Sequence, residues 1–115
     1  MINQFVYRDN EPFFEKTYIV TVKKAQHKNG NTALIGYDQY GQFFSIFTVV
    51  AGDNMTNERY VQLDNSEAQH YIDDILINMG IIEGEFSNNS SSDYPIYRIC
   101  EKAYLHLEQD ESILD

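Results

Sequence analysis

The sequence predicts an α+β fold in which a mainly antiparallel, four- to five-stranded sheet is covered by one helix, in the order βββ-β-α-β. Three observations lead to this prediction. Residues 17–24 alternate two sets of side chains with a period of two, which is typical of a strand. Asn29-Gly30 follows, and this dipeptide favours the tight turn of a β-hairpin. Between residues 68 and 79, apolar side chains recur at helical spacing.

Similar patterns predict the other strands. Residues 32–37 return from the hairpin, residues 42–50 follow a second turn, and residues 59–63 form a short fourth strand. The stretch 42–50 is apolar on both faces, which is typical of a strand in the middle of a sheet. Residues 94–100 predict a last strand, because Pro95 is tolerated near a strand's start. Residues 101–107 either extend that strand or form a helix.

The helix is expected from about residue 66 to residue 79. Asp64 and Glu67 have the spacing of a capping pair at its start. Gly80 stands where a glycine in the left-handed conformation ends a helix. The apolar stripe is expected to build the core together with sheet residues of the same character: Tyr18, Val20, Leu34, Phe44, Ile46, Val61 and Ile96.

A single domain is expected for the 115 residues. Residues 1–15 are expected to form an N-terminal arm or edge strand, and residues 108–115 an acidic, frayed tail. No apolar run is long enough to span a membrane. The first residues also lack the pattern of a secretion signal. A cytoplasmic protein without membrane binding is therefore expected.

Charge is distributed unevenly along the chain, whose formal net charge is −10. Residues 1–63 carry six acidic and six basic side chains, whereas residues 64–115 carry twelve acidic and two basic ones. Because phosphates are bound by Lys and Arg, direct nucleic-acid binding is not expected. An anionic half instead attracts a basic protein surface, including that of a nucleic-acid-binding protein. Solubility alone explains the same charge.

The candidate binding site consists of acidic residues from this anionic half: Asp73, Asp74, Glu83, Glu85, Asp93, Glu108, Asp110 and Glu111. Carboxylates spaced along one surface can imitate a phosphate backbone and occupy a basic groove. The sequence thus predicts a non-catalytic binding protein, and inhibition of a host defence nuclease is one form of that role. The alternative is a self-associating module or homodimer, because one helix leaves a second sheet face uncovered, with Ile19, Phe43, Phe47 and Val49.

Catalytic signatures such as G-x-S-x-G, a Walker loop or C-x-x-C do not occur, so neither an enzyme nor a cofactor is expected. Glu67, His70 and Asp74 fall near one face of the predicted helix and could hold a divalent ion. A solvated helix face explains the same pattern and is favoured. His27 is assigned to a turn and His106 to the tail, where a lone histidine is rarely a ligand.

Cys100 is the sole cysteine, so neither an internal disulfide nor an all-cysteine zinc site can form. Arg98 and Lys102 beside it could lower its pKa, but a buried, inert thiol is the favoured interpretation. Arg59 and Arg98 both lie on predicted strands. Each is expected to pair with a carboxylate rather than to contact a ligand.

Short stretches between residues 29 and 100 resemble a family of small uncharacterised bacterial proteins, a domain of unknown function. The stretches are Asn29-Gly30, Ala33-Leu34-Ile35, Gly41-Gln42-Phe43, Thr48-Val49, Tyr60-Val61, Asn65-Ser66-Glu67, Met79-Gly80-Ile81-Ile82 and Tyr94-Pro95-Ile96-Tyr97-Arg98-Ile99. The chain departs from the family pattern where Gln42-Phe43 lacks a nearby proline and where Val50 replaces an asparagine. The family is common among accessory genes of conjugative elements. The resemblance therefore implies a mobile element or phage as the setting, with no assigned reaction.

Overall fold

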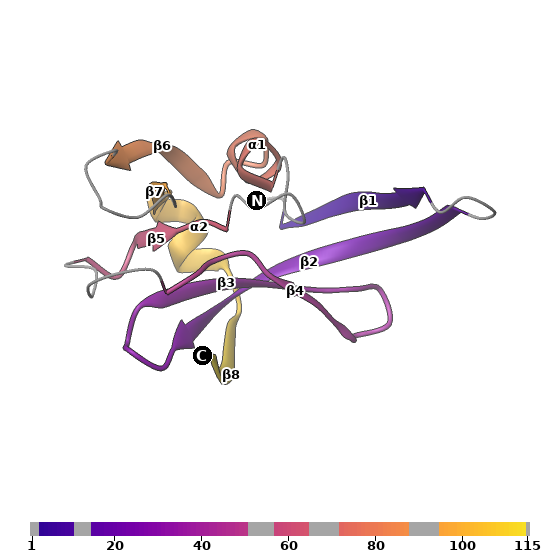
Figure 1. The fold of residues 1–115 in the computed structure, drawn as a ribbon, viewed down its shortest axis with the longest axis horizontal. Helices are drawn as coiled ribbons and strands as arrows, with labels where there is room; N and C mark the ends of the chain where they lie inside the picture. Colours follow the sequence, from indigo (N-terminus) through magenta and orange to yellow (C-terminus); the bar gives the residue numbers. More distant parts are fainter. Residues whose placement is uncertain (1–2, 11–14, 51–56, 65–71, 88–94, 115) are drawn as a thin grey trace.

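The computed structural model describes residues 3–10, 15–50, 57–64, 72–87 and 95–114. Their elements are β1 (Gln4–Asn10), β2 (Glu15–His27), β3 (Thr32–Tyr37), β4 (Phe43–Ile46), β5 (Tyr60–Gln62), α1 (Ile72–Asn78), β6 (Ile82–Ser87), β7 (Ile96–Ile99), α2 (Glu101–His106) and β8 (Gln109–Leu114) (Figure 1). The α+β class and the mostly antiparallel pairing agree with the prediction. The described residues form two sheets and two helices, where the sequence predicted one of each.

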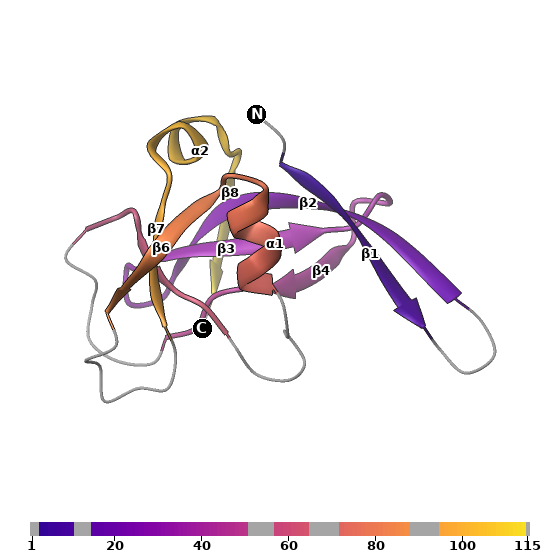
Figure 2. The same cartoon turned by 90° about the horizontal axis from the view of Figure 1, so that it is seen from above.

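The larger sheet is built around β2, with the strand order β1-β2-β3-β4 and with β8 also paired to β2. β1 pairs antiparallel with residues 15–21 of β2. β8 pairs parallel with the far part of β2, from Lys24 to His27. Since β3 occupies the other edge of β2, β1 and β8 share one edge of this long strand. The small sheet and both helices lie on one side of this sheet (Figure 1), and Figure 2 shows the same arrangement from above.

β8 replaces the frayed tail that the sequence predicted for residues 108–115. The Lys24 N–H donates to the Glu108 carbonyl over 2.9 Å, and the Lys28 N–H donates to the Leu114 carbonyl over 2.6 Å. The chain between β7 and β8 is helical, which settles the open alternative for residues 101–107. Acidic residues are depleted in strands, so only the non-local pairing with β2 reveals this strand.

The turns that join β2 to β3 and β3 to β4 have the chemistry that the sequence indicates. Gly30 and Gly41 adopt φ values of 94° and 75°. The Asp38 Oδ1 atom accepts hydrogen bonds from the N–H groups of Tyr40 and Gln42, each over 2.9 Å. An aspartate that bonds to the backbone just after it favours a turn. These turns set the register from β2 to β4.

β4 ends at Ile46 and is shorter than the strand predicted over residues 42–50, and the Phe47 N–H makes the last backbone hydrogen bond to β3, to the Leu34 carbonyl over 2.9 Å. Phe47 turns into the core and is 1% exposed. Thr48 then forms an antiparallel bridge with Leu63. This bridge connects the large sheet to the second sheet, so the apolar stretch serves two sheets in succession.

The second sheet has the order β5-β7-β6 and is antiparallel. β5 and β7 correspond to the predicted strands 59–63 and 94–100, whereas β6 was not predicted. The main core lies between the two sheets and the helices. Of the residues predicted for it, Val20, Leu34, Val61 and Leu76 are buried, while Ile46 joins a smaller cluster with Ala25, Ala33 and Ile35.

α1 is the described part of the predicted helix, and residues 66–71 lie outside the described residues. Ile72 and Leu76 point into the core, as the apolar stripe predicts. Gly80 has a φ of 78°, and the Ile81 N–H donates to the Leu76 carbonyl over 3.0 Å. The predicted glycine stop is thus confirmed. Among the described residues, no helix is long and apolar enough to cross a membrane.

Candidate binding surface

The two faces of the large sheet differ in their covering. Val20 and Val22 point to the core and are fully buried. Ile19 points the opposite way and is 42% exposed, since successive side chains of a strand alternate between faces. Val6, which pairs with Ile19, and Phe43 on β4 are 58% and 54% exposed. We call this side of the large sheet the outer face.

The outer face is smaller than the sequence predicted. Phe47 was assigned to it but is buried in the core. Val49 lies beyond the end of β4, where its N–H donates to the Gln62 carbonyl over 3.0 Å. The assignment was wrong for Phe47 because the register of the β3–β4 ladder shifts between the Tyr37–Phe43 and Gly36–Ser45 pairs, which reverses the faces of the residues that follow.

A connected group of side chains lies on the outer face between β4 and β8. The Tyr37 hydroxyl donates to Asp110 Oδ2 over 2.8 Å, and the Tyr37 ring meets the Phe43 ring edge-on at a centroid distance of 6.2 Å. Lys23 Nζ lies 5.1 Å from the centroid of the Tyr37 ring and 3.5 Å from Glu108 Oε2. We call Lys23, Tyr37, Phe43, Glu108 and Asp110 the outer-face cluster.

Asp110 keeps its negative charge at neutral pH. Hydrogen bonds from the side chain and the backbone of Ser112 are the main causes that lower the pKa of Asp110, and the Tyr37 hydroxyl adds to them. The hydrogen bond to Asp110 raises the pKa of Tyr37 above its ordinary value, as does burial. Asp110 is therefore a carboxylate and Tyr37 a neutral phenol. Their contact holds β8 against the sheet without removing its charge.

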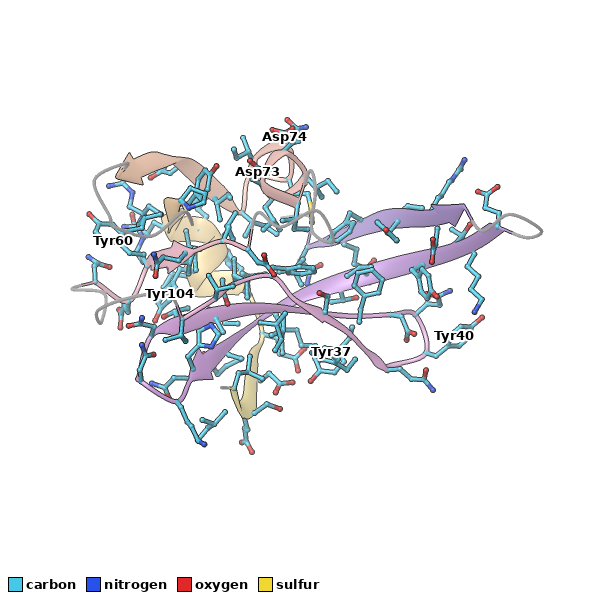
Figure 3. The ribbon with its side chains drawn as sticks, viewed as in Figure 1. Tyr37, Tyr40, Tyr60, Asp73, Asp74 and Tyr104 are labelled. Carbon is cyan, nitrogen blue, oxygen red and sulfur yellow. The ribbon has the colours of Figure 1, made fainter. Side chains whose placement is uncertain are left out.

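The predicted acidic residues do not share one surface. Glu108, Asp110 and Glu111 lie at the start of β8, whereas Asp73 and Asp74 lie on α1, on the opposite side of the molecule (Figure 3). The backbone of Glu85 belongs to β6, but its side chain lies outside the described part of the structure, as does all of Asp93. Of the β8 acids, Asp110 contacts Tyr37, whose ring meets the exposed Phe43 ring.

Glu83 is held in a structural ion pair. It lies opposite Arg98 in the β6–β7 ladder, and the Arg98 guanidinium donates to its carboxylate. Arg59 Nη2 lies 4.0 Å from the same oxygen, and Arg59 Nε donates to the Ile99 carbonyl over 2.9 Å. The expected pairing of both arginines with a carboxylate is thus confirmed. Because two cations surround it, Glu83 adds no free negative charge to a binding surface.

Cys100 has the character of an inert thiol. Burial is the largest cause that raises its pKa, and the nearby Glu83 carboxylate adds to it. Arg59 and Arg98 oppose this effect but do not outweigh it. Since the thiolate is the reactive form, the arrangement disfavours nucleophilic chemistry at this residue.

His27 is the polar residue that the sequence placed wrongly. It is the last residue of β2 rather than part of a turn, and it is 2% exposed. Its Nε2 atom lies 2.8 Å from the Thr48 hydroxyl oxygen, which also accepts a hydrogen bond from the Leu34 N–H over 3.3 Å. The group therefore stabilises the junction between the sheets. The residues just before it, Lys24, Ala25 and Gln26, do not alternate in a way that would predict its burial.

The metal-ion alternative cannot be assembled from the described residues. Glu67 and His70 lie outside them, and Asp74 is an exposed residue of α1. Within the ranges described above, three or more His, Cys, Asp or Glu side chains do not gather in a group that could hold a metal ion. His106 is exposed at the end of α2.

Comparison of the chain with protein-family models, with curated proteins and with solved structures gives no match. The resemblance to a family of mobile-element proteins therefore stays a prediction.

Proposed function

We propose that the protein is a non-catalytic binding protein that engages a basic protein surface through β8 and the outer-face cluster. The observation that carries the proposal is the connection between acidic and apolar groups. Asp110 contacts Tyr37, and Tyr37 contacts Phe43, so the acids of β8 continue directly into an exposed aromatic side chain.

The two kinds of group serve different purposes in recognition. Charged side chains steer an oppositely charged partner and select against wrong ones, whereas buried aromatic anchors supply most of the affinity. The side chain of Glu108 is 71% exposed and Phe43 is 54% exposed, so both are accessible to a partner. The formal charge of −10 supports the same role, because it favours approach of a basic surface.

A protein partner has more support than imitation of nucleic acid. A phosphate-like row requires carboxylates along one surface, and Asp73 and Asp74 lie on the opposite side of the molecule from β8 (Figure 3). Glu83, a third member of the predicted row, is neutralised by Arg98. A mobile-element setting remains part of the proposal only through the family resemblance.

The test is a tagged pull-down from a lysate of the native host at about 0.1 M and about 0.5 M salt, followed by mass spectrometry. Screening shortens over this range, so a charge-steered contact weakens. The Glu108→Gln/Glu111→Gln variant removes two charges from the β8 region. The Asp73→Asn/Asp74→Asn variant removes the same charge from α1 and is the matched control.

We expect a basic partner that is retained at the lower salt, released at the higher salt, and lost from the β8 variant but not from the α1 variant. Equal loss from both variants would mean that overall charge, rather than this surface, causes the capture. Undiminished binding by the β8 variant, or the absence of any specific partner, would overturn the proposal.

A further inference from the structure

β1 and the first part of β2 form a two-stranded ribbon that projects from the rest of the fold (Figures 1 and 2). The β2–β3 ladder extends only to the Thr21–Tyr37 pair, whereas the β1–β2 ladder continues to Asn10 and Glu15. Residues 15–20 of β2 are therefore paired with β1 alone. A two-stranded ribbon is at best marginally stable in water, so its edges are places where further pairing is favourable.

One edge of this ribbon is closed by a side chain. The Gln39 amide accepts a hydrogen bond from the Ile19 N–H over 2.9 Å and donates one to the Thr17 carbonyl over 3.1 Å. It thereby substitutes for a neighbouring strand along β2. Natural sheets commonly block exposed edges in such ways, because unpaired backbone groups invite another chain.

The other edge, along β1, has no such block among the described residues. The Val22 N–H donates to the Asn3 carbonyl, so the backbone of Asn3 points toward β2. Alternate residues follow the same direction, so the odd-numbered residues of β1 bond to β2. In an antiparallel ladder, alternate residues point their N–H and C=O groups the other way. The backbone groups of Gln4, Val6, Arg8 and Asn10 therefore point outward. β1 carries them over seven residues in unbroken register.

The charge of the ribbon suits contact between two copies of the chain. Residues 4–10 and 15–21 contain Arg8 and Lys16 against Asp9 and Glu15, which makes the ribbon neutral. The acidic residues in excess all lie after residue 63. Two molecules that each carry a formal charge of −10 can thus meet through the ribbon without bringing like charges close together.

We propose that the occupant of the β1 edge is a second copy of this chain, paired antiparallel through the same strand. Outward-pointing residues must face one another, so the two-fold axis passes through a residue and not between two. An axis at Tyr7 aligns all of β1, with Val6 opposite Arg8 of the second copy. An axis at Arg8 sets two cations against each other, and an axis at Val6 leaves part of the strand unpaired.

This register joins the two large sheets into one continuous sheet. Tyr7 lies at the centre, where it already contacts Phe44 edge-on at a centroid distance of 5.4 Å and is 39% exposed. A tyrosine opposite its own copy adds a cross-strand aromatic pair. β8 lies away from the ribbon, so the dimer presents the acidic surface twice (Figure 1).

Sedimentation equilibrium of the whole chain, up to about 1 mM, tests the inference. We expect a dimer that strengthens with salt, because screening reduces repulsion between the two acidic copies. Val6→Pro removes an outward N–H that makes no hydrogen bond with any described residue, and Val6→Lys places a charge at the edge without constraining the backbone. Both are expected to give a monomer. Phe43→Lys alters the outer face away from β1 and should leave the dimer intact.

Disulfide trapping tests the register in a Cys100→Ser background. Tyr7→Cys places two thiols opposite each other in a pair without mutual hydrogen bonds, where Cα atoms about 4.5 Å apart permit a disulfide. Rapid cross-linking is expected, and Val6→Cys should cross-link more slowly.

A monomer at every concentration, or a dimer lost in Phe43→Lys and kept in Val6→Pro, would overturn the inference. Because partner capture by β8 is measured separately and weakens with salt, the two proposals can fail independently.

Discussion

The ring of Phe47 lies against the backbone of Gly36. A Cβ atom on Gly36 would come within 2.7 Å of Phe47 Cζ and within 2.7 Å of Val20 Cγ1. The absence of a side chain at this position of β3 lets the aromatic ring pack over the core face of the sheet. The register shift between Phe43 and Ser45 places Phe47 on the core face, and Gly36 leaves room for its ring there.

Gly36→Ala is therefore expected to destabilise the fold by about 1–3 kcal/mol, as overpacking of a core does. Urea denaturation measures the change in the free energy of unfolding. Adding Phe47→Leu should offset part of the loss, because a smaller side chain makes room for the methyl group. If the two substitutions are simply additive, the contact is not the cause.

Leu76→Ala is expected to cost about 2–5 kcal/mol, because Leu76 is fully buried and its removal leaves a cavity. Chemical denaturation gives the value. Ile77→Ala, next to it on α1 but 40% exposed, is the matched control and should cost clearly less. An unchanged midpoint for Leu76→Ala would contradict the packing of α1 on the core.

Thr48→Val should destabilise the protein by about 1–3 kcal/mol, since its hydroxyl hydrogen-bonds with His27 and Leu34 in the buried junction. Thr21→Val removes an exposed hydroxyl that accepts from Gln4 and should change stability by less than about 0.5 kcal/mol. Thermal unfolding compares the two variants. Equal effects would show that burial of the Thr48 hydroxyl is unimportant.

The contact between Tyr37 and Asp110 predicts a pH dependence with opposite signs at the two extremes. The folded pKa of Asp110 is lowered, so its contribution is complete above the unfolded pKa of about 3.9 and is lost as the pH falls further. The folded pKa of Tyr37 is raised, so its contribution is complete below about 10 and is lost as the pH rises through the folded value. Unfolding free energies measured against pH should show both losses.

Asp110→Asn is the variant that isolates this dependence. It should flatten the acid limb of the stability profile and reduce the alkaline one, while Glu111→Gln should leave both largely unchanged. A profile for Asp110→Asn that superimposes on that of the wild type would show that the carboxylate does not couple β8 to β3.

Cys100 should react slowly with iodoacetamide near neutral pH, since burial and the Glu83 carboxylate raise its pKa. Glu83→Gln removes the second cause and should accelerate the reaction. A free cysteine peptide supplies the reference rate. Alkylation of the folded protein as fast as that of the peptide would contradict an inert thiol.

The sequence by itself determined the features that depend on neighbours along the chain. The alternation over residues 17–24 lies within β2, Asn29-Gly30 forms the expected turn, and Gly80 ends α1. These elements follow from local backbone preferences and from the period of apolar residues. The α+β class follows from their order.

Only the tertiary structure decided which segments meet across long stretches of chain. The acidic composition of β8 does not predict a strand, which forms because β2 has a free edge to pair with. The burial of Phe47 likewise depends on Gly36, a distant residue that leaves room for its ring. The charges of the C-terminal half could be counted from the sequence, but their division between α1, β8 and the ion pair of Glu83 could not. Such placements depend on non-local packing and on backbone hydrogen bonds between distant segments, which leave no periodic signal in the chain.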